Sequence, residues 1–251
     1  MKRCFIAGNW KMNLCRAEST ALAGGIASAL GDTPGVDVAV CPPSIYLDAV
    51  ATTLDGSPVS LGAQDVYFEE QGAFTGELSP SMLCDIGCRY VILGHSERRH
   101  VLGEDDTLVN CKLHAALDYG LLPIVCVGET LEQREAGDAE SVVINQVKGA
   151  LARLSTDSVA KVTVAYEPIW AIGTGRTALP EDADSMAGVI RKIVGDVSTF
   201  DISEEVRVLY GGSVNPGNIK EFMAKSHIDG ALVGGVSLDS DQFAAVVRFW
   251  M

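Results

Sequence analysis

The chain has 251 residues, of which 47% are hydrophobic and 21% charged, so it has enough apolar material for a folded core and lacks the polar bias of a disordered protein. Its 33 acidic residues against 19 basic ones give a formal net charge of -14, which disfavours binding to nucleic acid or to anionic membranes. The first residues form an apolar run too short for a signal peptide, and no stretch reaches membrane-spanning length without charges, so a cytoplasmic protein is expected.

Eight short apolar runs rich in β-branched residues predict β-strands. They cover residues 4–8, 36–41, 59–63, 90–94, 122–128, 161–166, 205–210 and 228–234. Each run is hydrophobic at almost every position, which is typical of strands that are buried on both faces of a parallel sheet.

Segments with helical periodicity lie between these runs. The clearest are residues 17–30, 106–120 and 182–197, and Gly120 marks the end of the second. No linker rich in proline, glycine or serine interrupts the alternation, so residues 1–251 are predicted to form one α/β domain. Eight strand–helix units favour a single closed (β/α)8 barrel with eight parallel strands, and an open doubly wound sheet is the alternative.

Polar residues and glycines follow the predicted strands in turn. They are Asn9, Lys11, Gln64, His95, Glu129, Glu167, Gly211 to Ser213, Gly234 and Gly235. In a barrel of parallel strands all these positions lie on one rim, so residues far apart in the sequence would meet at a single pocket. A solvated rim would also be polar, and each residue therefore needs its own argument.

His95 ends the fourth apolar run, and Ser96 is expected to cap a helix that begins at Glu97. The partial positive charge of a helix N-terminus disfavours imidazolium and leaves a neutral ring that can donate a hydrogen bond. A purely structural turn histidine is the alternative. The segment GHSER lacks the final glycine of a nucleophile elbow, so a nucleophilic serine is not supported.

Glu167 stands directly before Pro168, which keeps the glutamate out of the helical region and extended at a strand tip. The apolar residues 169–172 and the glycines after them have the composition of a lid that excludes water and moves on a hinge. One alternative is a surface loop with a solvated acid. Another is a nucleotide fingerprint, since residues 173–178 match GxGxxA, but these glycines lie too far beyond the strand end.

Paired glycines end the last two predicted strands, at Gly211–Gly212 and Gly234–Gly235. Glycine lets backbone amides approach an anion closely, and barrels commonly bind phosphate after strands seven and eight. Such amides together with Lys11 would hold a phosphate dianion in a protein of net charge -14.

The cysteines form an odd set without CxxC spacing, which indicates reduced core thiols and no metal site. They are Cys4, Cys15, Cys41, Cys84, Cys88, Cys111 and Cys126. Between the third strand and the next predicted helix, residues 66–80 are long for a barrel connection and rich in aromatic residues, which favours an interaction surface over a solvated loop.

Seven motifs occur in the order and spacing of the triosephosphate isomerase family, which the chain resembles over essentially its whole length. They are GNWKMN, GAFTGELSP, YVILGHSERR, CVGET, AYEPIWAIGTGRTA, YGGSVNP and DGALVGG. The resemblance implies the interconversion of dihydroxyacetone phosphate and D-glyceraldehyde 3-phosphate through an enediolate, in glycolysis and gluconeogenesis, with no cofactor or metal.

The resemblance also implies site residues. The catalytic ones are Glu167 as the base, His95 as a neutral proton shuttle, Lys11 as the positive charge and Asn9 as a hydrogen-bond donor, with Glu97 and Ser96 supporting them and Glu97 orienting Lys11. Substrate binding falls to Asn9, Lys11, Gly173, Ser213, Gly234 and Gly235. The lid consists of Pro168, Ile169, Trp170, Ala171, Ile172, Gly173, Thr174, Gly175, Arg176, Thr177 and Ala178.

The family further implies a homodimer formed through the loop of residues 65–80, with Thr75, Gly76, Glu77 and Cys15 at the interface. Two positions depart mildly from the family pattern: Arg176 stands where lysine is frequent, and Val236 where alanine is commoner. A phosphate-binding barrel without catalysis and an enzyme that uses nicotinamide cofactors are the alternative functions. The joint presence of Asn9, Lys11, His95 and Glu167 argues against the first of these.

Overall fold

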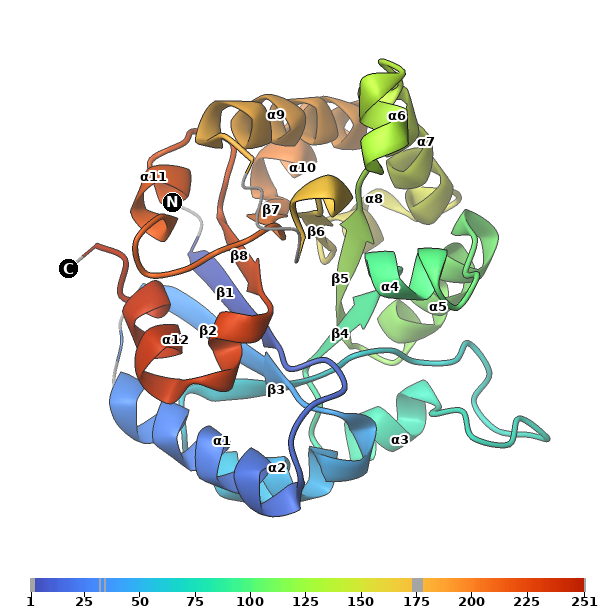
Figure 1. The fold of residues 1–251 in the computed structure, drawn as a ribbon. Helices are drawn as coiled ribbons and strands as arrows, with labels where there is room; N and C mark the ends of the chain where they lie inside the picture. Colours follow the sequence, from blue (N-terminus) through green and yellow to red (C-terminus); the bar gives the residue numbers. More distant parts are fainter. Residues whose placement is uncertain (1–2, 32, 34, 173–177, 251) are drawn as a thin grey trace.

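Eight parallel strands close into a ring in the order of the chain (Figure 1), in a computed structural model that describes residues 3–31, 33, 35–172 and 178–250. The strands of this described part are β1 (Cys4–Asn9), β2 (Val36–Cys41), β3 (Val59–Ala63), β4 (Tyr90–Leu93), β5 (Leu122–Val127), β6 (Thr163–Tyr166), β7 (Arg207–Tyr210) and β8 (Gly230–Val233). The ring closes where Phe5 to Gly8 of β1 pair with Gly230 to Val233 of β8. The predicted (β/α)8 barrel is confirmed, and the open sheet is excluded.

Helices surround the strands on the outside of the ring (Figure 1). They are α1 (Arg16–Leu30), α2 (Leu47–Leu54), α3 (Pro80–Asp85), α4 (Ser96–His100), α5 (Asp106–Asp118), α6 (Leu131–Glu135), α7 (Ala139–Leu151), α8 (Thr156–Val159), α9 (Pro180–Val197), α10 (Phe200–Glu205), α11 (Ile219–Met223) and α12 (Ser240–Val247), with 3-10 turns η1 (Ser44–Tyr46), η2 (Ile169–Ala171) and η3 (Gly235–Leu238). The three helices predicted from periodicity correspond to α1, α5 and α9. Helix α9 starts earlier than expected because Pro180 needs no N–H partner at the first position of a helix.

The strands are apolar at nearly every position because both of their faces are buried. Alternate side chains fill the interior of the barrel, and Phe5 stacks on Tyr90 there with ring centroids 4.6 Å apart. The remaining side chains of each strand pack against the helices in a second, larger cluster. This two-sided burial explains why the strands read as continuous apolar runs.

The described cysteines are all free thiols, although fewer of them lie in the core than expected. Cys41, Cys88 and Cys126 are buried, whereas Cys15 and two others in the helix layer are exposed. Among the residues that the structure describes, no group of three or more histidine, cysteine or acidic side chains lies close enough to bind a metal ion. None of the described helices is long and apolar enough to cross a membrane.

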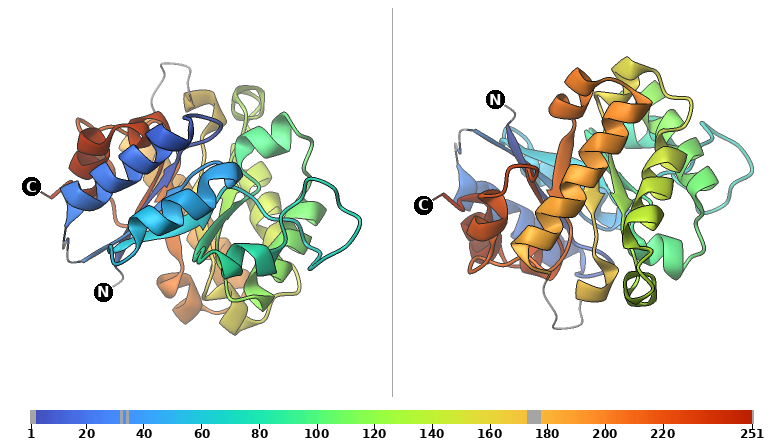
Figure 2. Two further views of the ribbon diagram at one scale, coloured as in Figure 1. Left: turned by 90° about the horizontal axis from the view of Figure 1, so that it is seen from below. Right: turned by 90° about the horizontal axis from the view of Figure 1, so that it is seen from above.

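Between β3 and α3 the chain leaves the barrel as a long arm, residues 64–79, which projects beyond the helix layer in Figures 1 and 2. The arm has internal order. Tyr67 N–H donates to the carbonyl of Leu78 at 2.8 Å, and the Tyr67 ring lies 4.8 Å from that of Phe74. These contacts leave the tip of the arm exposed to solvent.

Arg191 of α9 ties the outer layer to the end of the barrel. Its buried guanidinium donates from Nη1 to the carbonyls of Ser203 and Val206 at 2.8 and 3.0 Å. From Nη2 it donates to the carbonyl of His227 at 3.1 Å and forms an ion pair with Asp229. One side chain of α9 therefore satisfies polar groups from two other segments, residues 203–206 and 227–229.

Replacing Arg191 with methionine is expected to lower the free energy of unfolding by about 3–5 kcal/mol, because it removes the charged group that pairs with the carboxylate of Asp229 and donates to three carbonyls. Lys192→Met, at the exposed neighbouring position, is the matched control and should change stability by less than about 0.5 kcal/mol. Denaturant unfolding followed by circular dichroism measures both. Equal midpoints for the two variants would show that the buried contacts of Arg191 do not stabilise the fold.

Candidate active site

The carboxyl ends of the strands surround a cavity of about 420 Å³. Its lining comes from β1, β4, β6, β7, β8 and the segments that follow them, and includes Asn9, Lys11, His95, Glu167, Ile172, Ser213, Gly234 and Gly235. The predicted convergence of strand exits on one pocket is confirmed for the first, fourth, sixth, seventh and eighth strands, whereas Gln64 and Glu129, after the third and fifth, are not among its lining residues. Residues that are more than two hundred positions apart in the sequence share this pocket because the barrel closes.

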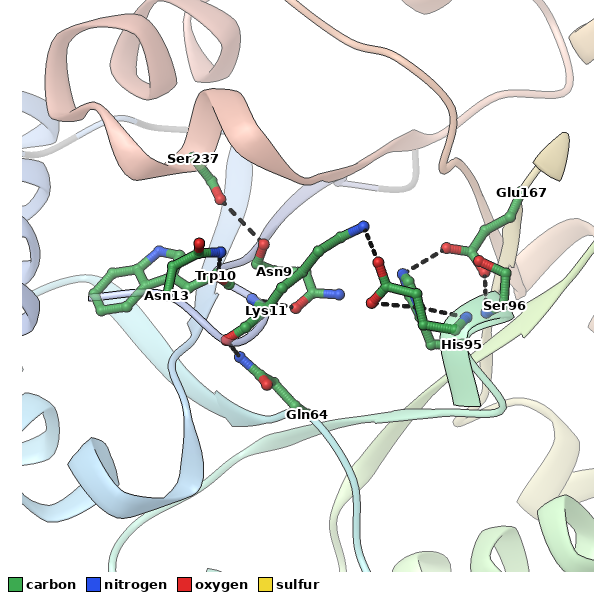
Figure 3. Close-up of polar contacts among 10 residues, drawn as sticks. Asn9, Trp10, Lys11, Asn13, Gln64, His95, Ser96, Glu167 and Ser237 are labelled. Carbon is green, nitrogen blue, oxygen red and sulfur yellow. Dashed lines mark hydrogen bonds and ion pairs between the residues drawn. The ribbon is translucent and has the colours of Figure 1, made fainter. Parts of the chain in front are cut away.

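Glu167 and His95 both line this cavity, and their side chains point toward each other (Figure 3). Glu167 Oε1 lies 2.8 Å from His95 Nε2, and Oε2 accepts the backbone N–H of Ser96 at 2.8 Å. Both side chains are buried, with 2% of the Glu167 side chain and 7% of the His95 side chain exposed. A carboxylate and an imidazole therefore meet in a site that is largely shielded from water.

The prediction that Ser96 caps a helix starting at Glu97 is wrong. Helix α4 begins at Ser96 and His95 is its N-cap, because the ring Nδ1 accepts the backbone N–H of Glu97 at 3.2 Å. The backbone N–H of Ser96 is instead directed at Glu167. Since Nδ1 is an acceptor, the hydrogen of the neutral ring lies on Nε2, on the side of the cavity.

The pKa values of His95 and Glu167 are set jointly. Burial lowers the pKa of His95, but the carboxylate of Glu167 opposes it and raises that pKa above its ordinary value. Burial raises the pKa of Glu167, but His95, the N–H of Ser96 and the charge of Lys11 together lower it below its ordinary value. Glu167 is therefore an ionised base at neutral pH. The sequence argument for a neutral His95 considered only the helix N-terminus. In the structure the charges of Glu167, Glu97 and Lys11 also act on the pKa of His95.

Lys11 extends its ammonium group toward α4 and lies between the first strand and His95 (Figure 3). Its Nζ contacts Glu97 Oε1 at 2.6 Å. Asn9 is nearly buried, and its Oδ1 accepts the backbone N–H of Lys11 at 3.0 Å. This contact leaves the amide nitrogen of Asn9 as a donor toward the cavity. The carboxylate expected to orient Lys11 is thus in contact with it.

Two glycines make room for the base: Gly211, which the sequence analysis placed near a phosphate, and Gly128, to which it gave no role. A β-carbon on Gly128 would lie 1.7 Å from the carbonyl oxygen of Glu167, and one on Gly211 would lie 2.8 Å from its Cγ. A larger residue at either position would displace the glutamate. Gly211 directly follows a predicted strand and Gly128 is the last residue of another, so their place at the strand ends was the available signal.

The triosephosphate isomerase family model matches residues 4–250 of the chain. The chain belongs to the triosephosphate isomerase family. The triosephosphate isomerase of Rhodopirellula baltica is 55% identical over 248 residues, which cover 98% of this chain and 97% of that protein. That of Carboxydothermus hydrogenoformans is 52% identical over 248 residues, with 99% of each chain covered, and that of a Roseiflexus species is 51% identical over 249 residues, with 99% and 98% covered.

The family resemblance seen in the motifs is therefore confirmed. Members of the triosephosphate isomerase family are cofactor-independent isomerases of glycolysis, and this is the function expected from the sequence. The matched region includes all eight strands and every described residue of the cavity lining.

The first residues of the predicted lid, 168–172, are held in place by contacts with the segment after β5. We call them the lid stem. The indole of Trp170 donates to Glu129 Oε1 at 2.7 Å and lies under the guanidinium of Arg134, 4.4 Å from the ring centroid. Ile169 N–H donates to the carbonyl of Glu129 at 3.1 Å. Pro168, Ala171 and Ala178 are buried, and Ile172 lines the cavity. Gly173, Thr174, Gly175, Arg176 and Thr177 lie outside the described residues.

Ser213, Gly234 and Gly235, which were expected at the phosphate together with Gly173, line the cavity on the side formed by β7 and β8. Ser213 donates its hydroxyl to the carbonyl of Ala171 at 2.7 Å, which joins the β7 exit to the lid stem. Gly234 follows β8, and Gly235 begins the turn η3. Val236 also lines the cavity. A short helical turn therefore follows β8 beside the expected phosphate site.

The residues expected at a subunit interface lie away from the cavity lining. Thr75, Gly76 and Glu77 are exposed on the projecting arm. Cys15 is exposed at the start of α1, where its backbone N–H donates to Glu18 at 2.7 Å. Neither the arm nor Cys15 contributes to the pocket that holds Glu167 and His95.

Proposed function

We propose that Glu167 is the base with which this chain interconverts dihydroxyacetone phosphate and D-glyceraldehyde 3-phosphate. The carboxylate removes a proton from the carbon next to the carbonyl, the C–H electrons form the carbon–carbon double bond, and the carbonyl electrons move to oxygen. Returning the same proton to the neighbouring carbon completes the exchange of ketose and aldose. The observation that carries this proposal is the ionised carboxylate 2.8 Å from an imidazole in one buried pocket.

His95 and Lys11 stabilise the negative charge that develops on oxygen. The hydrogen on Nε2 of His95 points into the cavity and hydrogen-bonds the carbonyl oxygen, and the ring carries protons between the two oxygens of the enediolate. Lys11 supplies the positive charge, and the amide of Asn9 donates a further hydrogen bond. Preorganised donors in a site with little water are worth far more than the same donors in solution.

Glu167 and His95 are hydrogen-bonded to each other through Oε1 and Nε2. A contact of 2.8 Å leaves no space for a substrate between the two atoms, so the carboxylate moves off the ring when the carbonyl binds there. The carboxylate then lies next to the substrate carbon, and its charge no longer raises the pKa of His95 as strongly. Burial and the N–H of Glu97 at Nδ1 favour the neutral ring in the complex.

The phosphate group of the substrate lies on the β7–β8 side, held by backbone amides of Gly173, Ser213, Gly234 and Gly235. Lid residues 168–178 close over the enediolate and exclude water, which protects the intermediate from losing its phosphate. Triose phosphates are small anions, which suits a protein whose net charge of -14 disfavours nucleic acid and anionic membranes. A cytoplasmic location and one domain over residues 1–251 belong to the same proposal.

A cofactor-free assay of isomerisation between the two triose phosphates tests this function. Conversion in both directions without added metal or nucleotide is the expected result. Binding of phosphate esters without conversion would instead identify the chain as a phosphate-binding barrel that lacks catalysis.

A homodimer is part of the proposed functional form. Exposed apolar side chains follow four neighbouring strands of the barrel, and the arm of residues 65–80 projects from the same region. These exposed apolar side chains are Met12, Ile45, Phe74, Met82, Val101 and Leu102. Apolar side chains gathered in one sector of a surface mark an interaction site, and a second copy of the chain is the expected partner.

Thr75→Arg is expected to raise the dissociation constant of the dimer by at least about 100-fold, because burying an uncompensated charge at the interface costs about 3 kcal/mol or more. Thr156→Arg, at an exposed position of α8, is the matched control and should leave assembly unchanged. Sedimentation velocity over a range of concentrations measures both constants. A wild-type chain that sediments as a monomer at all concentrations would refute the dimer.

A further inference from the structure

The backbone of Lys11 is in an unfavourable conformation. Its φ angle is 52°, in the left-handed region, where the β-carbon of a residue other than glycine is crowded by the backbone. Leu14, three residues later, has a φ of 74°. The turn that carries the proposed substrate-binding lysine is therefore strained at two positions, and such strain persists only where surrounding contacts determine the conformation.

Gln64 makes two of the contacts that hold this turn. Its side-chain Nε2 donates to the carbonyl of Lys11 and to the carbonyl of Cys41, both at 2.8 Å. The Cys41 carbonyl also accepts the backbone N–H of Trp10 at 3.1 Å. Both hydrogens of the Gln64 amide are thus used to fasten the turn after β1 to the end of β2. Figure 3 shows Gln64 directly beside the backbone of Lys11.

The chain at Gln64 is itself fixed by the next residue. Asp65 accepts Lys112 Nζ at 2.8 Å on both oxygens and Arg98 Nη2 at 2.8 Å. Arg98 Nε also donates to Glu104 at 2.7 Å. The Lys112 side chain is only 2% exposed. Gln64 therefore extends from a position held by a buried network of charges, which makes it a rigid support.

We propose that Gln64 is a positioning residue for the isomerisation: it holds Lys11 in its left-handed conformation so that the ammonium group enters the cavity. The inference rests on the role proposed for Lys11. When the amide donor is lost, the carbonyl of Lys11 loses its partner and the peptide relaxes toward an ordinary conformation. The side chain then starts from a different direction, away from its contact with Glu97.

Gln64→Met keeps the length of the side chain and removes both donated hydrogen bonds. It is expected to lower kcat/KM for the triose phosphates by about 10²-fold, since a small displacement of a substrate-binding group has an effect of this size. The inhibition constant of inorganic phosphate, which competes for the same pocket, should rise. Gln64→Asn, which keeps the amide but is one methylene shorter, should give a smaller change in the same direction.

Asn110→Leu is the matched control for losing an amide that spans two carbonyls. Asn110 of α5 donates to the carbonyls of Ala150 and Ala152 at 2.7 and 3.0 Å, outside the cavity lining. Its replacement should lower stability but leave kcat/KM and phosphate inhibition unchanged. A similar loss of activity in Asn110→Leu and Gln64→Met would mean that general destabilisation explains both, and would overturn the positioning role.

A double-mutant cycle with Lys11→Met is the decisive experiment. If Gln64 acts through Lys11, adding Gln64→Met to Lys11→Met causes little further loss of kcat/KM, whereas independent effects would add and overturn the proposal. Full activity of Gln64→Met beside a defective Lys11→Met overturns the positioning role alone. Full activity of Lys11→Met overturns the assigned role of the lysine and, with it, this inference.

Discussion

Glu167→Gln is expected to lower kcat/KM by about 10³- to 10⁴-fold, which is the contribution of a well-placed general base. The amide keeps the size of the side chain and its oxygen can accept a hydrogen bond from either Ser96 or His95, but it cannot remove a proton from carbon. Steady-state kinetics in both directions measure the loss. The inhibition constant of inorganic phosphate should stay nearly constant, because the proposed phosphate site lies on the β7–β8 side of the cavity, away from the Glu167 carboxylate.

Glu167→Asp tests the geometry of the same group. It retains the carboxylate but withdraws it by one methylene, so turnover should fall strongly while affinity for phosphate is largely kept. Glu132→Asp, on the exposed surface of α6, is the matched control and should leave turnover unchanged. Wild-type turnover in both Glu167 variants would remove this residue from the mechanism.

Lys11→Met is expected to lower kcat/KM by about 10²- to 10³-fold, comparable to removing one donor at a developing oxyanion. Among the described residues that line the cavity, Lys11 is the one lysine or arginine. Methionine keeps most of the length of its side chain but carries no charge. Both the affinity for phosphate esters and kcat should therefore decrease. Lys161→Met, at an exposed position before β6, is the matched control.

The same variant has an expected effect on the pH profile. The charge of Lys11 helps to hold the pKa of Glu167 below its ordinary value, and activity is lost as the pH falls through that pKa. Without the ammonium group the pKa of Glu167 rises, so the acid limb of kcat/KM moves to higher pH. A limb that stays in place would mean that Lys11 does not act on the charge of the base.

Much of the fold was predictable from the sequence because burial in a parallel barrel leaves a strong local pattern. Each strand is apolar on both faces, so its run of β-branched residues is visible without any knowledge of its neighbours. The boundaries were less accurate. β4 and β6 are shorter than the apolar runs that predicted them. Gly94, at the end of the first run, already belongs to the loop after β4, whereas Lys161 and Val162, at the start of the second run, belong to the turn before β6.

The candidate site was predictable as a set of residues but not as a set of contacts. Position at strand exits identified Asn9, Lys11, His95 and Glu167 as members of one pocket. The same pattern singled out Gln64 without a role and passed over Gly128. Their functions depend on which backbone atoms lie within a few ångströms, and spacing along the chain carries no such information.

The sequence by itself determined the alternation of strand and helix and the family, because these depend on residues that are neighbours in the chain. Only the tertiary structure decided that His95 rather than Ser96 caps α4, that a carboxylate raises the pKa of this histidine, and that Gln64 supports the strained turn at Lys11. Hydrogen bonds and charge interactions at this strength act only over a few ångströms. Closure of the barrel sets those distances, by bringing together segments that are far apart in the chain.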